Sequence, residues 1–232
     1  MDSILKNESF KRFATGIILG FCFFGAYFHS LLLFSLILFA LLFIILFFEW
    51  PTLINLPITN IKYWLISIFY PILPISTLIY LNIKFRDTDF LFPLYPFIVS
   101  WTADTGGYIL GKLIGKHKIC PNISPGKSWE GFLGSFTAVT VLNIFILPGI
   151  KTFPFVLYLQ SFFPILLFSF LLTTIAFLGD IFISYLKRKR DLKDTGNLLP
   201  GHGGLLDRFD SVLFVSTLLL LIIIVDKLIS SL

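Results

Sequence analysis

Charged side chains are scarce in this sequence. Only 13% of its 232 residues are Asp, Glu, Lys or Arg, against roughly 25% in water-soluble domains. Hydrophobic residues make up 56% and aromatic residues 18%, with 29 phenylalanines among them. Too little polar surface remains to coat a soluble globule, and disordered chains are poor in aromatic residues and rich in charge. The composition therefore excludes both classes and indicates an integral membrane protein.

Alternating polarity and paired cysteines are also missing. A membrane β-barrel would show segments of about ten residues with alternating polarity, whereas the apolar runs here are unbroken. The predicted fold class is an all-α, polytopic membrane bundle. Cys22 lies in an apolar run and Cys120 in a polar loop, so we expect two free thiols. The net charge of +5 favours lipid headgroups or phosphates over nucleic acid as partners.

Seven apolar runs are long enough to cross a bilayer. They cover approximately residues 13–29, 31–48, 64–82, 91–111, 131–148, 162–183 and 211–229. Pro71 and Pro74 predict a break in the third run, and Pro93 and Pro96 a break at the start of the fourth. The first run has no small-x-small cleavage site, so we expect a retained helix. We expect a short interfacial segment at 154–164.

Basic residues are divided unequally between the two predicted sides of the membrane. Fourteen of the 18 lie on one side, which includes the loops 112–130 and 184–210. The remaining four are Lys84, Arg86, Lys151 and Lys227. The positive-inside rule places the basic side in the cytoplasm, with the N-terminus inside and the C-terminus outside. We therefore expect a multi-pass protein of the inner (cytoplasmic) membrane, with its active site facing the cytoplasm.

Polar chemistry is concentrated in the second half of the chain. Residues 1–100 carry no ionisable group well inside an apolar run and are predicted to form a lipid-facing membrane anchor. Seven of the 13 acidic residues fall between 104 and 210. The sequence predicts a catalytic portion at 101–232 that contains both basic loops.

The fourth run contains an acid and a regular series of glycines. Asp104 within a span would cost several kcal/mol unless paired or hydrated, which favours a functional role over a structural hydrogen bond. Gly107, Gly111 and Gly115 recur at four-residue spacing, and this pattern predicts close helix packing.

The loop that follows resembles a phosphate-binding loop only superficially. Gly126-Lys127-Ser128 lacks the earlier glycine of that motif, since Pro121 stands there. We expect a helix to begin near Ser128, with an anion held at its positive end. The alternative is a basic loop that only sets topology.

The segment 179–210 carries the densest group of polar residues. On a helix, Asp180, Ser184 and Lys187 share one face at positions i, i+4 and i+7, and Asp207 and Asp210 do so at i and i+3. Carboxylates that converge from separate helices suit Mg²⁺, a hard ion that is commonly shared with substrate phosphates. We expect Asp180 and Asp207, at the cytoplasmic ends of antiparallel helices, to reach one ion.

At this point the sequence resembles a known family, the phosphatidate cytidylyltransferases or CDP-diacylglycerol synthases. Their signature is similar to Ser184-x-Leu186-Lys187-Arg188-x4-Lys193-Asp194-x-Gly196-x2-Leu199-Pro200-x-His202-Gly203-Gly204-Leu205-x-Asp207-Arg208-Phe209-Asp210. Residues 116–118 and 123–131 resemble a second conserved block, and Asp104 with Tyr108 a third. The likeness covers about 100–215. Ile183 departs from the family's usual Glu, and the N-terminal part is shorter than in typical bacterial members.

The resemblance implies a reaction of CTP with phosphatidate, in the lipid bilayer, that yields CDP-diacylglycerol and pyrophosphate and uses Mg²⁺. A second metal ion and a homodimer are left open. The implied metal ligands are Asp180 and Asp207, supported by Asp210 and Asp104. The implied catalytic residues that contact phosphates are Ser184, Lys187, Arg188, Lys193, His202 and Arg208. The implied substrate-binding residues are Lys116, Ser124, Lys127, Ser128, Gly203 and Gly204.

Two other readings of the sequence stay open. A polyprenol-type kinase or a cytidylyltransferase for another lipid would share the nucleotide site, and labelled CTP separates these enzymes. A transporter with a polar midplane site would leave the Gly–His–acid block unexplained.

The charge distribution predicts the membrane orientation of two loops. A cysteine probe near Asn122 or Asn197 should be labelled only from the cytoplasmic face, because both positions lie in the basic loops. Labelling of both positions from outside would overturn this orientation.

Overall fold

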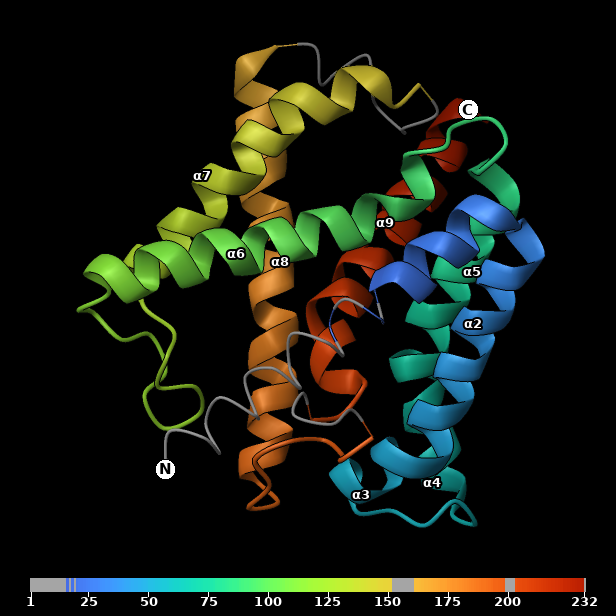
Figure 1. The fold of residues 1–232 in the computed structure, drawn as a ribbon, viewed down its shortest axis with the longest axis vertical. Helices are drawn as coiled ribbons and strands as arrows, with labels where there is room; N and C mark the ends of the chain where they lie inside the picture. Colours follow the sequence, from blue (N-terminus) through green and yellow to red (C-terminus); the bar gives the residue numbers. More distant parts are fainter. Residues whose placement is uncertain (1–15, 17, 19, 152–160, 199–202, 232) are drawn as a thin grey trace. The chain divides into compact units, whose positions relative to one another are not determined.

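The computed structural model describes residues 16, 18, 20–151, 161–198 and 203–231. After a helical stretch at 20–29, its labelled α-helices are α2 (Leu31–Ile44), α3 (Trp50–Ile54), α4 (Ile61–Ser67), α5 (Leu73–Phe85), α6 (Tyr95–Ile114), α7 (Trp129–Ile146), α8 (Phe162–Arg188) and α9 (Leu206–Ser230) (Figure 1). The π-helical turns Ile45–Glu49 and Ile68–Ile72 join α2 to α3 and α4 to α5. The 3-10 turns Phe92–Leu94 and Leu147–Gly149 precede α6 and follow α7.

Five helical segments of the described chain are long and apolar enough to cross a membrane. They are Leu31–Ile54, Ile61–Phe85, Trp129–Gly149, Phe162–Arg188 and Leu206–Ser230. The predicted all-α membrane class is confirmed. The fourth predicted run forms α6, which is more polar than these five because it carries Asp104, Lys112 and three glycines. The first predicted run and the 154–164 segment lie partly outside the described residues.

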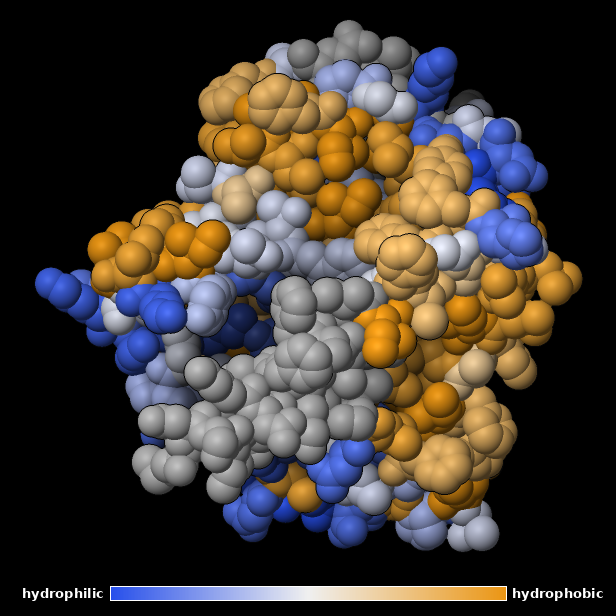
Figure 2. Space-filling model, viewed as in Figure 1, coloured by the Kyte–Doolittle hydropathy of each residue, from blue (hydrophilic) through white to orange (hydrophobic). Residues whose placement is uncertain are grey.

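Large apolar side chains are exposed on the faces of these helices (Figure 2). Phe69 is 75% exposed and Phe145 78% exposed. Such surfaces are unfavourable in water and match the hydrocarbon of a bilayer. Cys22 and Cys120 are both free, as predicted.

The chain divides into two compact units. Unit 1 comprises Met1–Ile83 and Leu186–Phe209, and unit 2 comprises Lys84–Tyr185 and Asp210–Leu232. Most of the 184–210 segment therefore shares a unit with the N-terminal helices. The division of function at residue 100 stays a prediction.

Hydrogen bonds from polar side chains connect the helices of unit 1. The Asn82 amide donates to the Leu31 carbonyl at 3.0 Å and to Ser35 Oγ at 2.9 Å, which ties α5 to α2. Trp50 Nε1 donates to Ser67 Oγ at 3.0 Å, and the Tyr63 hydroxyl donates to the carbonyl of Leu46. The predicted proline break occurs at the π-helical turn before α5, where Tyr70 has non-helical backbone angles.

Glycines bring α6 and α7 of unit 2 into close contact. A Cβ added to Gly106 would lie 2.6 Å from the Gly134 carbonyl oxygen, and one on Gly134 would lie 2.5 Å from the Gly106 oxygen. A Cβ on Gly107 would lie 2.5 Å from Ser135 Oγ, whereas one on Gly111 would make an ordinary contact of 3.6 Å with Gly131 Cα. The packing role predicted for the glycine series is confirmed for Gly107, whereas Gly111 has room for a methyl group.

A buried chain of hydrogen bonds links three helices of unit 2. Tyr95 donates to Asn143 Oδ1 at 2.8 Å, and Asn143 Nδ2 donates to Ser169 Oγ at 2.8 Å. All three side chains are buried. Their polar atoms are satisfied within the bundle, which membrane burial requires.

The glycine contact predicts an asymmetric response to alanine. Gly134→Ala should lower the free energy of unfolding by about 1–3 kcal/mol, because the new methyl group forces α6 and α7 apart. Gly25→Ala is the matched helical control, since nothing lies within 4 Å of its added Cβ, and it should be neutral or slightly stabilising. Denaturation in detergent measures both. Equal stability of the two variants would contradict the packing role.

Candidate functional site

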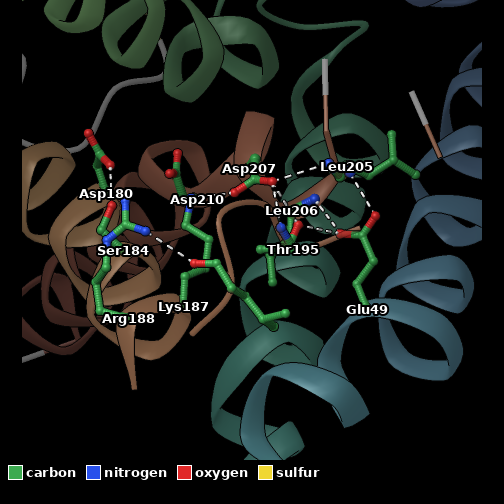
Figure 3. A network of polar contacts seen from close by, with 12 residues as sticks. Glu49, Asp180, Ser184, Lys187, Arg188, Thr195, Leu205, Leu206, Asp207 and Asp210 are labelled. Carbon is green, nitrogen blue, oxygen red and sulfur yellow. Dashed lines mark hydrogen bonds and ion pairs between the residues drawn. The ribbon is translucent and has the colours of Figure 1, made fainter. Parts of the chain in front are cut away.

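Asp207 accepts hydrogen bonds on both of its oxygens in unit 1 (Figure 3). The Lys187 ammonium lies 2.6 Å from Oδ1. Oδ2 accepts from the backbone N–H of Thr195 at 2.8 Å, from its hydroxyl at 3.1 Å, and from the N–H of Gly204 at 3.1 Å. We call Lys187, Thr195, Gly204 and Asp207 the Asp207 cluster. It joins the beginning and the end of the segment predicted to carry the chemistry.

Local backbone chemistry explains why Asp207 takes this position. It lies in the first turn of α9, where a carboxylate meets unpaired N–H groups and the positive end of the helix. Gly203 has φ +78°, which favours glycine. A Cβ on Gly204 would lie 2.0 Å from Thr195 Oγ1, so no side chain fits there.

Glu49 is a polar residue of this site that sequence reasoning missed. It is 1% exposed and accepts from the N–H groups of Leu205 at 2.7 Å and Leu206 at 2.8 Å, and from Thr195 Oγ1 at 3.0 Å (Figure 3). Glu49 lies in the part of the chain that the sequence predicts to be a lipid-facing membrane anchor. The sequence feature that could have identified Glu49 is its position as an acid directly after the 31–48 apolar run.

A second polar cluster lies in unit 2, centred on Lys127. Its ammonium forms an ion pair with Asp180, and Ser184 Oγ donates to the other Asp180 oxygen at 3.2 Å. Burial disfavours the charged ammonium, but Asp180, Asp104 and Asp210 outweigh it and raise the pKa of Lys127. Carboxylates from α6, α8 and α9 thus act on one lysine, which lies in the loop before α7. We call Asp104, Lys127, Asp180, Ser184 and Asp210 the Lys127 cluster.

The loop that supplies Lys127 is held by short-range contacts. Ile119 N–H donates to the Lys127 carbonyl at 3.1 Å, and His117 Nδ1 lies 2.6 Å from Glu130 Oε1. The predicted helix start is confirmed, since α7 begins at Trp129 with Ser128 as its cap. Ser128 is buried, and its hydroxyl accepts from Gly131 N–H at 3.1 Å.

The remaining predicted site residues are mostly solvent-facing. Exposed side chains belong to Lys116, Arg188, Lys193 and Arg208. Arg188 donates to the Leu192 carbonyl at 3.2 Å. Ser124 is half-buried within its loop. His202 lies outside the described residues.

The carboxylates of unit 2 offer hard oxygen donors for a divalent ion. Asp104, Asp180 and Asp210 all act on the Lys127 ammonium, and Mg²⁺ prefers such oxygen ligands. Within the part of the chain that the structure describes, no three Asp, Glu, His or Cys side chains are already arranged around one metal position. The donor chemistry fits Mg²⁺, while its coordination stays a prediction.

Comparisons with known proteins agree with the resemblance. A profile of the Cytidylyltransferase family matches residues 10–225. A Staphylococcus haemolyticus protein named phosphatidate cytidylyltransferase is 45% identical over 131 residues, which cover 56% of this chain and 48% of that protein. A Bacillus subtilis protein of the same name is 46% identical over 122 residues, covering 52% and 43%. The chain spans about half the length of these curated relatives.

The Asp207 cluster predicts a large loss of stability when its charge is removed. Asp207→Asn should lower the free energy of unfolding by about 3 kcal/mol, because Lys187, whose side chain is 13% exposed, loses its carboxylate. Adding Lys187→Met should restore part of that loss.

Denaturation of the two single variants and the double variant in detergent measures the coupling between these residues. Asp226→Asn, on the same helix, is the control and should change stability little. Strictly additive effects of Asp207→Asn and Lys187→Met would refute the coupling.

Proposed function

The chain belongs to the cytidylyltransferase family, and we propose that it transfers the cytidylyl group of CTP to phosphatidate in the bilayer. The observation that carries this proposal is a pair of lysine–carboxylate contacts, of which one lies within the segment that resembles the family signature and the other joins the second conserved block to Asp180. Lys187 contacts Asp207, and Lys127 contacts Asp180. The similarity to proteins named phosphatidate cytidylyltransferase supports the choice of substrates.

The reaction joins two anions. A phosphate oxygen of phosphatidate attacks the α-phosphorus of CTP, and the bond from that phosphorus to the oxygen bridging to the β-phosphorus breaks. CDP-diacylglycerol forms and pyrophosphate leaves with the electron pair. Positioning and charge neutralisation are the main requirements of such a transfer. The attacking oxygen is already ionised near neutral pH, so no dedicated general base is needed.

Lysine and arginine side chains would neutralise the phosphates and hold them in line. Lys127 and Lys187 are charged and partly buried, which strengthens their interaction with an anion. Exposed Lys193 and Arg208 would reach phosphates from solvent. In a cytoplasm-facing site these groups would meet CTP from the side where this nucleotide is made.

Magnesium is the proposed cofactor. Asp180, with Asp104 and Asp210, would hold it in unit 2. The resemblance also implies Asp207, in unit 1, as a metal ligand. When bound, the ion would neutralise charge on the phosphates of CTP and stabilise the transition state electrostatically.

Turnover with labelled CTP in lipid vesicles tests this function. Label from the α-phosphate should enter lipid when phosphatidate is present, with one pyrophosphate released per lipid labelled. Transfer of the γ-phosphate to a polyprenol would instead show a kinase. Labelling of another lipid but not of phosphatidate would show a cytidylyltransferase of different specificity.

Charge-removing variants connect the activity to the site. Asp207→Asn and Asp180→Asn should each lower turnover by at least about a hundredfold, since each removes charge needed to stabilise the transition state. The double variant should be little slower than either single variant if both residues serve the same step. Asp226→Asn should keep wild-type turnover. Near-normal turnover and an unchanged Mg²⁺ requirement in Asp207→Asn would contradict these roles.

A further inference from the structure

We infer that Glu49 is a positioning residue for the proposed active site, holding the start of α9 and, through Thr195, the Asp207 carboxylate. Glu49 comes from the N-terminal helices, more than 140 residues before Thr195 in the chain. It does not belong to the pattern that resembles the family signature. The inference rests on the proposed function for its catalytic consequence, whereas the contacts themselves are independent of it.

The carboxylate of Glu49 serves as a distant cap for α9. That helix begins at Leu206, and the first N–H groups of a helix have no partner within it. The Leu205 N–H donates to Oε1 at 2.7 Å and the Leu206 N–H to Oε2 at 2.8 Å. A negative charge at this end is also favoured by the helix dipole. One buried side chain therefore fixes where α9 begins.

Two glycines of the signature make room for this carboxylate. A Cβ on Gly196 would lie 3.1 Å from Glu49 Oε1, and one on Gly204 would lie 2.9 Å from Oε2. Glu49 is itself 1% exposed, so it could not move aside into solvent. The carboxylate of Glu49 is therefore a close neighbour at both positions, and at Gly204 the hydroxyl of Thr195 adds a still closer contact of 2.0 Å.

Thr195 connects Glu49 to Asp207. Its hydroxyl lies 3.0 Å from Glu49 Oε2 and 3.1 Å from Asp207 Oδ2, and its backbone N–H donates to the same Asp207 oxygen at 2.8 Å. A hydroxyl carries one proton, so the two carboxylates share a single donor. Displacing Glu49 would therefore change the hydrogen bonding of Asp207 and of Lys187 beside it.

The local helix geometry aims Glu49 at these partners. A π-helical turn, Ile45–Glu49, separates α2 from α3. Such turns shift the direction of side chains and occur often at functional sites. The Glu49 carbonyl also accepts from Thr52 Oγ1 at 2.7 Å, which fixes the backbone after the turn.

Hydrogen exchange and kinetics on the full chain in lipid nanodiscs test the inference together. Glu49→Gln keeps the size of the side chain but replaces one carboxylate oxygen with an amide NH₂ group. This group is a donor and cannot accept a hydrogen bond from a backbone N–H. We expect amide exchange at Leu205 and Leu206 to rise at least about tenfold, and kcat to fall by at least about tenfold, since small misplacements near reacting groups are costly. The KM for CTP should change far less. Asp87→Asn, which changes an exposed acid in a turn outside this network, should change neither the amide exchange nor kcat.

A second pair of variants keeps the test decisive if Glu49→Gln does not fold. Thr195→Val removes the shared hydroxyl and should lower kcat, whereas Thr195→Ser retains it and should recover most of the loss. Wild-type exchange at Leu205 and Leu206 in Glu49→Gln would overturn the inference. So would faster exchange with unchanged kcat, because Glu49 would then be structural only. A wild-type protein without CTP turnover would refute the proposed function, and the exchange result would still decide whether Glu49 holds α9.

Discussion

Buried carboxylates that accept hydrogen bonds from backbone N–H groups organise the polar part of unit 1. Glu49 is 1% exposed, and the Asp207 side chain is 8% exposed. A charge this deeply buried is tolerated only with hydrogen bonds and charge partners around it. The N–H groups of Thr195, Gly204, Leu205 and Leu206 supply those bonds. The backbone of the signature segment is thereby fixed in position by the acids it surrounds.

Glycine has the same physical role in both units, which is to allow backbone to approach other groups closely. At the α6–α7 contact of unit 2 it lets two helices approach without a hydrophobic driving force, as helices in lipid require. In unit 1, Gly196 and Gly204 admit a carboxylate beside the backbone. The close contact between helices was predictable from the four-residue spacing of the glycine series that includes Gly107. The contact with a carboxylate was not predictable, because the partner, Glu49, is remote in sequence.

Long apolar runs and fixed local spacing were predictable from the sequence, whereas tertiary hydrogen bonding was not. The membrane class, the cap at Ser128 and the proline break before α5 follow from hydropathy and local backbone chemistry. The helical phase of Asp180 and Ser184 is confirmed by their hydrogen bond. The Lys187–Asp207 contact spans 20 residues, and the Glu49–Leu206 bond spans 157. Periodicity within one helix carries no information about such pairs.

Each cluster also pairs a carboxylate with a lysine that the proposed reaction would use for phosphate. Removing one partner of a partly buried ion pair is more costly than never forming it, because the other charge stays desolvated. Lys127 and Lys187 can therefore turn toward an incoming phosphate only if Asp180 and Asp207 gain another cation or another set of donors. Asp207 already has three N–H or O–H donors besides Lys187, whereas Asp180 has Ser184. On this basis Asp180 depends more strongly on a replacement cation than Asp207 does.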